Sequence, residues 1–152
     1  MTLEAVIHAP AAGETLSLRG TTVRVLSTAA TSVGASTFEF LALPGWDTGS
    51  HVHSRIEEQF YVIDGEMEVR AGDELIHGRA GTFVSIPAGV AHAFANRGEL
   101  PSRMLVVATP PGHERYFEEL AEILSGEGAP DPEAIAQLRA RFDTTQVSPL
   151  TV

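Results

Sequence analysis

A succession of short strand-like runs, separated by turn signals at intervals of about ten residues, dominates the chain from residue 21 to residue 109. The runs are rich in β-branched and aromatic residues, and glycine, proline, aspartate or asparagine bounds them. Strands this short and this closely spaced favour an antiparallel sandwich or barrel. The runs cover residues 21–28, 35–43, 58–64, 66–71, 81–87, 92–97 and 103–109. The pair Asp64-Gly65 predicts a tight hairpin, because both central positions of a type I′ turn need positive φ.

From Pro110 onward the hydrophobic period becomes helical. Five apolar residues share one face of a first predicted helix: Tyr116, Phe117, Leu120, Ile123 and Leu124. Asp131 and Pro132 read as the N-cap and first residue of a second helix, whose apolar face holds Ile135, Leu138 and Phe142. We therefore predict a β-barrel over residues 1–109. Residues 110–152 form a helical extension packed on it, in the same domain, with 143–152 as a tail.

Two residue types are missing, and their absence excludes several mechanisms. The chain has no cysteine, and all ten of its basic residues are arginine. Disulfides, thiolate nucleophiles and Cys-ligated metal centres are therefore excluded. So are Schiff-base chemistry on a lysine and a P-loop lysine.

The charge balance bears on partners and location. Twenty acidic residues against ten arginines give a net charge of −10, which argues against nucleic acids and anionic membranes as main partners. No apolar run is long enough to span a membrane. The first ten residues include Glu4 and have no basic stretch, so we expect no signal peptide and a cytoplasmic protein.

Three of the six histidines lie in two compact clusters. His51 and His53 are two residues apart on a predicted strand, so both side chains point to one face and suit a single metal ion. Glu58 follows a polar turn and can start the next strand in its own phase. If the phase of the strand after the turn differs by one residue, Glu57 is the candidate ligand in place of Glu58. In the second cluster, Pro87 and Gly89 mark a sharp turn before a strand that begins at His92.

Ten positions in these clusters resemble the two motifs of the cupin superfamily. The first motif is matched by Gly45, His51, His53, Glu58 and Gly65, and the second by Gly81, Pro87, Gly89, His92 and Asn96. The resemblance implies a small antiparallel jelly-roll barrel around one metal ion, held by His51, His53, Glu58 and His92. The segment 109–120 is also similar to single-domain cupins described as quercetin-dioxygenase-like.

Other residues have simpler interpretations. His8, His77 and His113 have no partner spacing and are expected at the surface. Asn96 is expected to make a structural hydrogen bond. Several apolar residues could line a substrate pocket, with ordinary core packing as the alternative: Phe38, Phe40, Trp46, Phe60, Val62, Met67, Phe94 and Met104.

The expected cofactor is one divalent transition metal. Four protein ligands close a tetrahedral zinc site but leave two positions on an octahedral ion, which favours Fe, Mn, Ni or Cu over Zn. The main hypothesis is a dioxygenase of a hydroxylated aromatic, such as a flavonol or a polyketide-like phenol, with Glu58 accepting the hydroxyl proton. Its substrates would be the small molecule and O₂.

Two alternatives remain open at this point. One is a non-oxidative isomerase, cyclase or decarboxylase in which the metal is a Lewis acid. The other is a binding module without turnover. We also expect a homodimer, with the apolar N-terminal residues Leu3, Val6 and Ile7 crossing to the partner.

Overall fold

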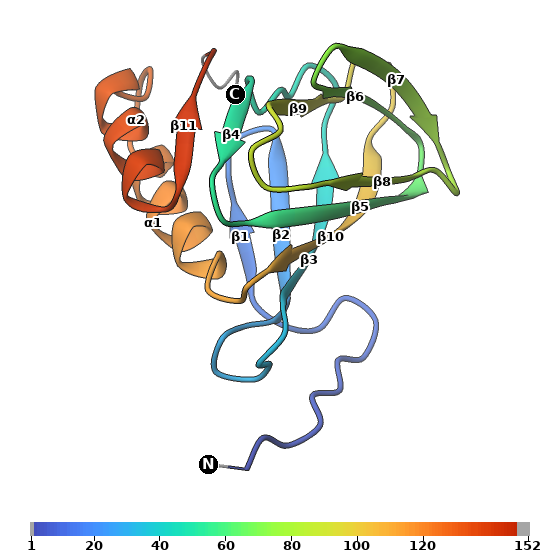
Figure 1. Cartoon of the computed structure of the whole chain (residues 1–152), viewed down its shortest axis with the longest axis vertical. Helices are drawn as coiled ribbons and strands as arrows, with labels where there is room; N and C mark the ends of the chain where they lie inside the picture. The colour runs from blue at the N-terminus through green and yellow to red at the C-terminus, as the bar shows by residue number, and fades with distance from the viewer. Residues whose placement is uncertain (1, 149–152) are drawn as a thin grey trace.

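The computed structural model describes residues 2–148 and consists of two antiparallel sheets with two helices beside them (Figure 1). The first sheet has six strands, in the spatial order β1 (Thr15–Ser17), β2 (Thr21–Ser27), β3 (Ser36–Ala42), β10 (Ser102–Thr109), β5 (Glu57–Asp64) and β8 (Phe83–Ile86). The second has five, in the order β11 (Thr144–Gln146), β4 (His51–His53), β9 (His92–Ala95), β6 (Glu66–Ala71) and β7 (Glu74–Arg79). The predicted fold class, a mainly β jelly-roll barrel, is confirmed.

The hydrophobic core fills the space between the two sheets. Along β3 every second residue is buried, so Phe38 and Phe40 point inward while their neighbours are only half-buried. The register pairs Phe40 with Met104 and Phe38 with Val106 of β10. Phe40 also meets Phe94 of the second sheet edge to face, with ring centroids 5.9 Å apart. Strict alternation therefore fixes which side chains face the barrel interior.

The helices α1 (Glu114–Leu124) and α2 (Pro132–Arg141) lie on one side of the barrel, next to β11 (Figure 1). The Asp131 side chain accepts a hydrogen bond from the Glu133 N–H at 2.9 Å, so the predicted N-cap is confirmed. Phe117 of α1 packs against Phe38, with ring centroids 4.9 Å apart, and the helical face thereby extends the barrel core. Neither helix is long and apolar enough to cross a membrane.

Two sequence predictions about local structure are wrong. Asp64-Gly65 does not close a hairpin, because β5 pairs with β10 and β8 while β6 pairs with β7 and β9. Gly65 instead carries the chain from one sheet to the other. The predicted tail contains β11, which pairs with β4. The alternation in β5 and β6 is the same for a hairpin as for a sheet crossing, so the sequence pattern could not separate them.

Other sequence predictions stay predictions. Residues 2–14 contain no helix or strand, and the side chain of Ile7 is 89% exposed. This exposure is compatible with the expected dimer and does not test it. The division of the chain at residue 109 also stays a prediction, and residues 149–152 of the expected tail lie outside the described part.

Gly65→Ala should destabilise the protein more than Gly81→Ala. Both glycines have positive φ, +77° and +92°, so either alanine introduces backbone strain of about 1–2 kcal/mol. Only at Gly65 would the new Cβ also lie 2.7 Å from Ser102 Oγ and 2.9 Å from the Pro101 carbonyl oxygen. We expect this overlap to cost about 1–3 kcal/mol more. Urea unfolding measures both variants, and equal losses would contradict the close approach.

Candidate metal centre

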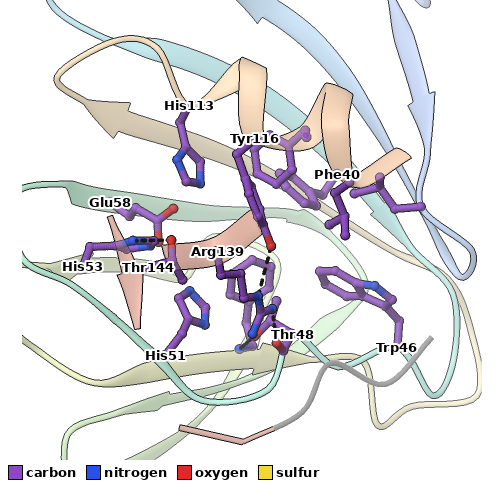
Figure 2. Close-up of a pocket in the computed structure, with 14 residues that line it drawn as sticks. Phe40, Trp46, Thr48, His51, His53, Glu58, His113, Tyr116, Arg139 and Thr144 are labelled. Atoms are coloured by element: carbon purple, nitrogen blue, oxygen red, sulfur yellow. Dashed lines mark hydrogen bonds and ion pairs between the residues drawn. The ribbon is translucent and has the colours of Figure 1, made fainter. Parts of the chain in front are cut away.

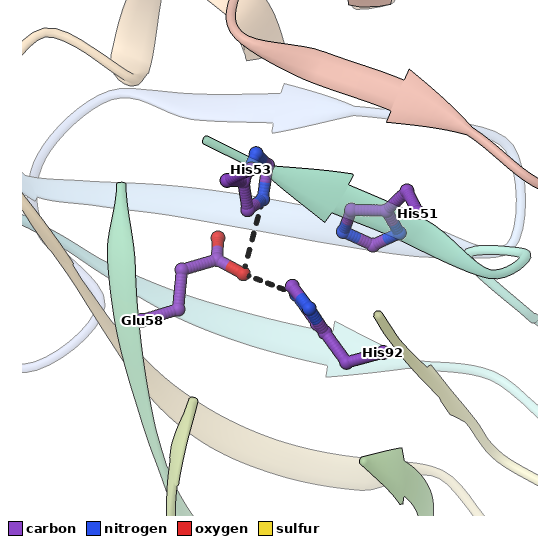
Figure 3. A group of neighbouring side chains, drawn as sticks. All are labelled: His51, His53, Glu58 and His92. Atoms are coloured by element: carbon purple, nitrogen blue, oxygen red, sulfur yellow. Dashed lines mark hydrogen bonds and ion pairs between the residues drawn. The ribbon is translucent and has the colours of Figure 1, made fainter. Parts of the chain in front are cut away.

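Four buried side chains from three strands meet inside the barrel (Figure 3). His51 and His53 flank Val52 on β4, and the alternation turns both imidazoles inward. His51 lies opposite His92 in the β4–β9 register, and Glu58 comes from β5 of the other sheet. One ligand atom from each residue lies within 4.8 Å of the others. The structure thus brings together all four residues that the motifs single out.

Glu58, and not Glu57, points into this cluster. Strand β5 begins at Glu57, whose half-buried side chain accepts a hydrogen bond from Gln59 Nε2 at 3.3 Å. Glu58 is buried, and its Oε2 lies 2.7 Å from His92 Nε2 and 3.3 Å from His53 Nε2. Both contacts involve one oxygen, and the other is directed away from His92 (Figure 3). The carboxylate therefore keeps one oxygen free of the two imidazoles.

Backbone carbonyls fix the orientation of all three imidazoles. The Nδ1–H groups of His51, His53 and His92 donate to the carbonyl oxygens of Gly49 (2.9 Å), Asp143 (3.0 Å) and Val90 (3.0 Å). Because a carbonyl oxygen can only accept, each ring donates through Nδ1, and its Nε2 is the nitrogen that remains as the potential metal ligand.

One nitrogen of the cluster lacks a hydrogen-bond partner, and a bound metal ion would satisfy it. His53 Nε2 is fully buried and has no hydrogen-bond partner of suitable geometry. A buried polar atom in this state is costly unless something binds it. Three Nε2 atoms and one carboxylate form a donor set that suits Mn, Fe, Ni, Cu or Zn. The residues present therefore fit a single divalent metal ion.

The charge states of Glu58 and His51 also suit a metal ion. Burial by itself would raise the pKa of Glu58, but the contacts with His53 and His92 outweigh it and hold that pKa well below its usual value. Burial, reinforced by the nearby His92, lowers the pKa of His51 from 6.5 to about 3. For His53 burial acts in the same direction, but Glu58 outweighs it and raises the pKa. Glu58 is thus an anion, and His51 is a neutral base.

Asp143, just before β11, supports the ligand strand from the far end of the chain. Its backbone oxygen receives the His53 Nδ1–H, and its carboxylate accepts the backbone N–H groups of Ser54, Arg55 and Ile56 at 3.1, 2.7 and 3.3 Å. Thr144 Oγ1 also lies 3.1 Å from His53 Nδ1. The loop between the ligand strands β4 and β5 is therefore held by residues about ninety positions later in the sequence.

A cavity with about 470 Å³ of free space, including its mouth, opens beside three of the four candidate ligands, His51, His53 and Glu58 (Figure 2). Its walls are mainly apolar, which is typical of small-molecule sites. The lining consists of Leu18, Phe40, Trp46, Thr48, His51, His53, Glu58, Phe94, His113, Tyr116, Phe117, Leu120, Arg139 and Thr144.

The predicted pocket residues divide between this lining and the core. Phe40, Trp46 and Phe94 line the cavity. Phe38, Phe60, Val62, Met67 and Met104 are buried in the hydrophobic core cluster and are not part of the lining. Inward orientation alone does not place a residue in the cavity wall: even Phe60, whose ring centroid lies 6.1 Å from that of His92, is not part of the lining.

The prediction that His113 lies at the surface is wrong. Its side chain is 5% exposed, and its ring stacks on Tyr116 and lies 5.4 Å from the ring of His53 between centroids. The same residue lines an outer cleft with Arg55, Pro111 and Phe142, so it separates that cleft from the inner cavity. The helical spacing of His113, Tyr116, Phe117 and Leu120 was the signal that could have placed it on the buried face.

Tyr116 and Arg139 are further lining residues that sequence reasoning did not select. Arg139 shares the buried face of α2 with Ile135 and Leu138, and this apolar context was the available signal. Its Nε donates to the Tyr116 hydroxyl at 3.1 Å and its Nη2 to the Thr48 carbonyl at 2.6 Å.

The remaining polar residues behave as expected. His77 and His8 are exposed, as predicted. The Asn96 amide donates to the carbonyls of Ala42 and Leu100 at 2.9 and 2.8 Å, which confirms its structural role.

A divalent ion should stabilise the wild-type chain through the four-residue cluster. At an ion concentration one hundred times the Kd, the gain is about 2.7 kcal/mol, seen as a higher Tm. His51→Ala and His92→Ala should lose this metal-dependent shift, whatever their own stability. The exposed His77→Ala serves as the control and should keep it. Differential scanning fluorimetry with Mn²⁺, Fe²⁺, Ni²⁺ and Zn²⁺ makes the measurement, and an unchanged shift in His51→Ala would contradict this centre.

His113→Phe should flatten the acid sensitivity of the metal-free protein. Burial lowers the pKa of His113 from 6.5 to about 4, so below pH 6.5 the unfolded chain binds a proton that the folded chain resists. The free energy of unfolding must therefore fall as pH decreases from 6.5 toward 4. Phenylalanine removes this contribution, which is about 3 kcal/mol at most. Urea unfolding at the two ends of this pH range tests it; an identical slope in both proteins would refute a buried neutral His113.

Comparisons with known proteins agree with this geometry. Residues 38–108 match the cupin-domain family model. The chain is 35% identical over 94 residues to a protein named polyketide synthase CurC from Streptomyces cyaneus, and 36% identical over 89 residues to protein SchB from Streptomyces halstedii. These alignments cover 60% and 57% of this chain, and 61% and 64% of the two relatives.

A solved structure gives a similar result. The polyketide cyclase RemF from Streptomyces resistomycificus superposes with a TM-score of 0.60 at 26% identity, over 70% of this chain and 79% of that one. A likeness to quercetin dioxygenases finds no support in the names of these relatives. The matched domain, the two antiparallel sheets and the buried ligand set show that residues 38–108 of this chain form a domain of the cupin superfamily.

Proposed function

We propose that this protein is a metal-dependent, non-oxidative enzyme that closes a ring in a polyketide-like substrate. The observation that carries the proposal is the position of Glu58: an ionised carboxylate among three imidazoles, at the wall of an apolar cavity. Such a group can take a proton from a carbon acid in a place from which water is largely excluded.

The relatives support a polyketide substrate. CurC is named a polyketide synthase protein, and RemF is named a polyketide cyclase. The alignments cover only part of CurC, so the transfer of substrate class to this chain is part of the proposal. The aromatic walls formed by Phe40, Phe94 and Phe117 suit a flat substrate that becomes an aromatic ring.

The reaction balances without an oxidant. Glu58 accepts a proton from the CH₂ group between two carbonyls, and the resulting enolate carbon forms a C–C bond to a second carbonyl carbon. The electron pair of that carbonyl moves to its oxygen, which takes the proton back from Glu58. Loss of water then gives the aromatic ring. This sequence needs neither a lysine nor a cysteine, which agrees with the composition of the chain.

The metal ion, when bound by His51, His53, His92 and Glu58, supplies Lewis-acid polarisation of a substrate oxygen. The chain's own residues do the rest. The three carbonyl-anchored imidazoles hold their Nε2 atoms in place, which keeps the ligand geometry rigid. The free oxygen of Glu58 is the atom that can accept the substrate proton (Figure 3).

Ring closure should proceed without O₂. We expect the metal-loaded protein to convert a synthetic linear triketo thioester into an aromatic product under nitrogen, at the rate seen in air. Glu58→Gln should lower kcat by about 10²–10⁴-fold, because the base is lost. Glu57→Gln is the matched control and should be as active as the wild type. Mass spectrometry follows the product, and metal analysis of each variant separates loss of the base from loss of the ion.

Other outcomes of this assay would replace the proposal. Consumption of one O₂ per product, followed with an oxygen electrode on phenolic substrates, would favour the dioxygenase hypothesis. Tight binding of the substrate with no product would favour a binding module.

A further inference from the structure

We propose that Arg139 and Tyr116 form an oxyanion-binding subsite that receives the enolate or phenolate oxygen of the substrate at a distance from the metal ligands. The inference deepens the proposed function and rests on it. It names a substrate class: compounds with two oxygens in a 1,3-relationship, one directed to the metal ligands and one to the guanidinium. It also assigns a function to two helical residues outside the cupin motifs.

The first observation is a buried cation without a counter-ion. Arg139 is 2% exposed, and its three hydrogen-bond partners are the Tyr116 hydroxyl, the Thr48 carbonyl and, at 3.4 Å, Gln146 Oε1. All three are neutral. Among residues 2–148, no carboxylate forms an ion pair with this guanidinium. A buried charge in this state is costly, and an anion that enters the cavity would offset the cost.

The second observation is a hydroxyl with an unused hydrogen. The Tyr116 oxygen accepts the Arg139 Nε–H, so its own hydrogen remains available for donation. Burial raises the pKa of Tyr116, which keeps the phenol protonated and therefore a donor. Trp46 lines the same cavity, and its indole N–H is also buried without a partner. Two of the residues that line this cavity, Tyr116 and Trp46, therefore carry donors that no protein group uses.

The third observation is the layout of the cavity. Figure 2 places Glu58 and His53 at one side, with Arg139 and the Tyr116 hydroxyl between them and Trp46. The rest of the wall is apolar and includes Leu18, Phe117 and Leu120. A ligand that fills this space has an apolar body and polar atoms at two separate places. A ring or chain with 1,3-related oxygens has this shape.

The chemistry follows from charge development. When Glu58 removes the proton, negative charge spreads over both oxygens of the 1,3-dicarbonyl unit. A fixed guanidinium and a phenolic O–H directed at one of them stabilise the charge where it forms, without reorganisation. The Arg139 guanidinium thus assists the proton transfer to Glu58, because it binds the enolate that this transfer produces.

The competing explanation is that Arg139 merely ties α2 to the barrel through Thr48. A neutral replacement of similar length would then reduce stability without altering the preference for anions. The experiment must therefore compare an anionic ligand with a neutral one of the same size, and it must not depend on catalysis.

The test uses dimedone, a cyclic 1,3-dione that is an enolate at neutral pH, and the monoketone cyclohexanone. The ring of dimedone holds its two oxygens apart, so it cannot chelate one metal ion. The chain has no cysteine and no lysine with which dimedone could react. NMR titration measures binding to the metal-free and the zinc-loaded protein.

We expect Arg139→Met to weaken dimedone binding by about 10- to 100-fold in both forms, since a hydrogen bond to a charged group is lost. Tyr116→Phe should weaken it by about three- to tenfold. Arg139→Lys should restore part of the affinity, because lysine keeps the positive charge but lacks the planar set of guanidinium N–H donors. Arg115→Met, on the exposed surface of α1, is the control and should bind as the wild type does. Cyclohexanone binding should change little in all four.

Three results would overturn the inference: no binding of dimedone by the wild type in either form, equal losses for dimedone and cyclohexanone, or wild-type affinity in Arg139→Met. Should Arg139→Met fail to fold, Tyr116→Phe alone decides, because it leaves the guanidinium and its bond to Thr48 in place. Dimedone binding that depends on Arg139, in a protein that closes no ring, would uphold the subsite and reject only the proposed cyclase.

Discussion

The arrangement of the barrel interior depends on one buried carboxylate. Glu58 is ionised although it is buried, and its charge is stabilised because His53 and His92 contact the same oxygen. The two sheets must therefore place β4, β5 and β9 close together at this point. Three local features bring these groups together: the alternation of β4, the register between His51 and His92, and the start of β5 at Glu57. The same contact that stabilises the carboxylate prepares the donor set for a metal ion.

The helices complete the site from outside the barrel. The cupin motifs supply the candidate ligands, but α1 with its N-cap contributes Tyr116 and His113 to the cavity lining, and α2 contributes Arg139. With these residues, the cavity has two polar regions, one at the candidate ligands and one at Arg139 and Tyr116, and its other walls are mainly apolar and aromatic. The candidate ligands thus come from strands, whereas the cavity wall combines strand residues such as Phe40 and Phe94 with residues of the helical segment, which the cupin motifs do not cover.

The sequence predicted the parts of the structure that follow from local spacing. The histidine positions, the Asp131 cap and the helical faces are readable because period and side-chain type determine them. The crossing at Gly65 was not readable, since Asp64-Gly65 fits a hairpin and a sheet corner equally well. Arg139 and Asp143 were missed for a different reason: their partners, Thr48 and His53, lie about ninety residues earlier in the chain. The apolar face of α2 could have marked Arg139 as buried, but a contact at that separation depends on the completed fold, so no local pattern identifies the partner.

The support that Asp143 and β11 give to β4 has a consequence for the order of events during synthesis. A chain that has emerged only as far as residue 140 can already pair β4 with β9, yet His53 then lacks the carbonyl that orients its ring. The loop 54–56 likewise lacks the carboxylate that holds it. A nascent chain should consequently pass through a stage with a formed barrel and an unfinished metal centre. All four candidate ligands are present at that stage, and docking of the segment 143–146 then fixes the His53 ring and the loop beside it.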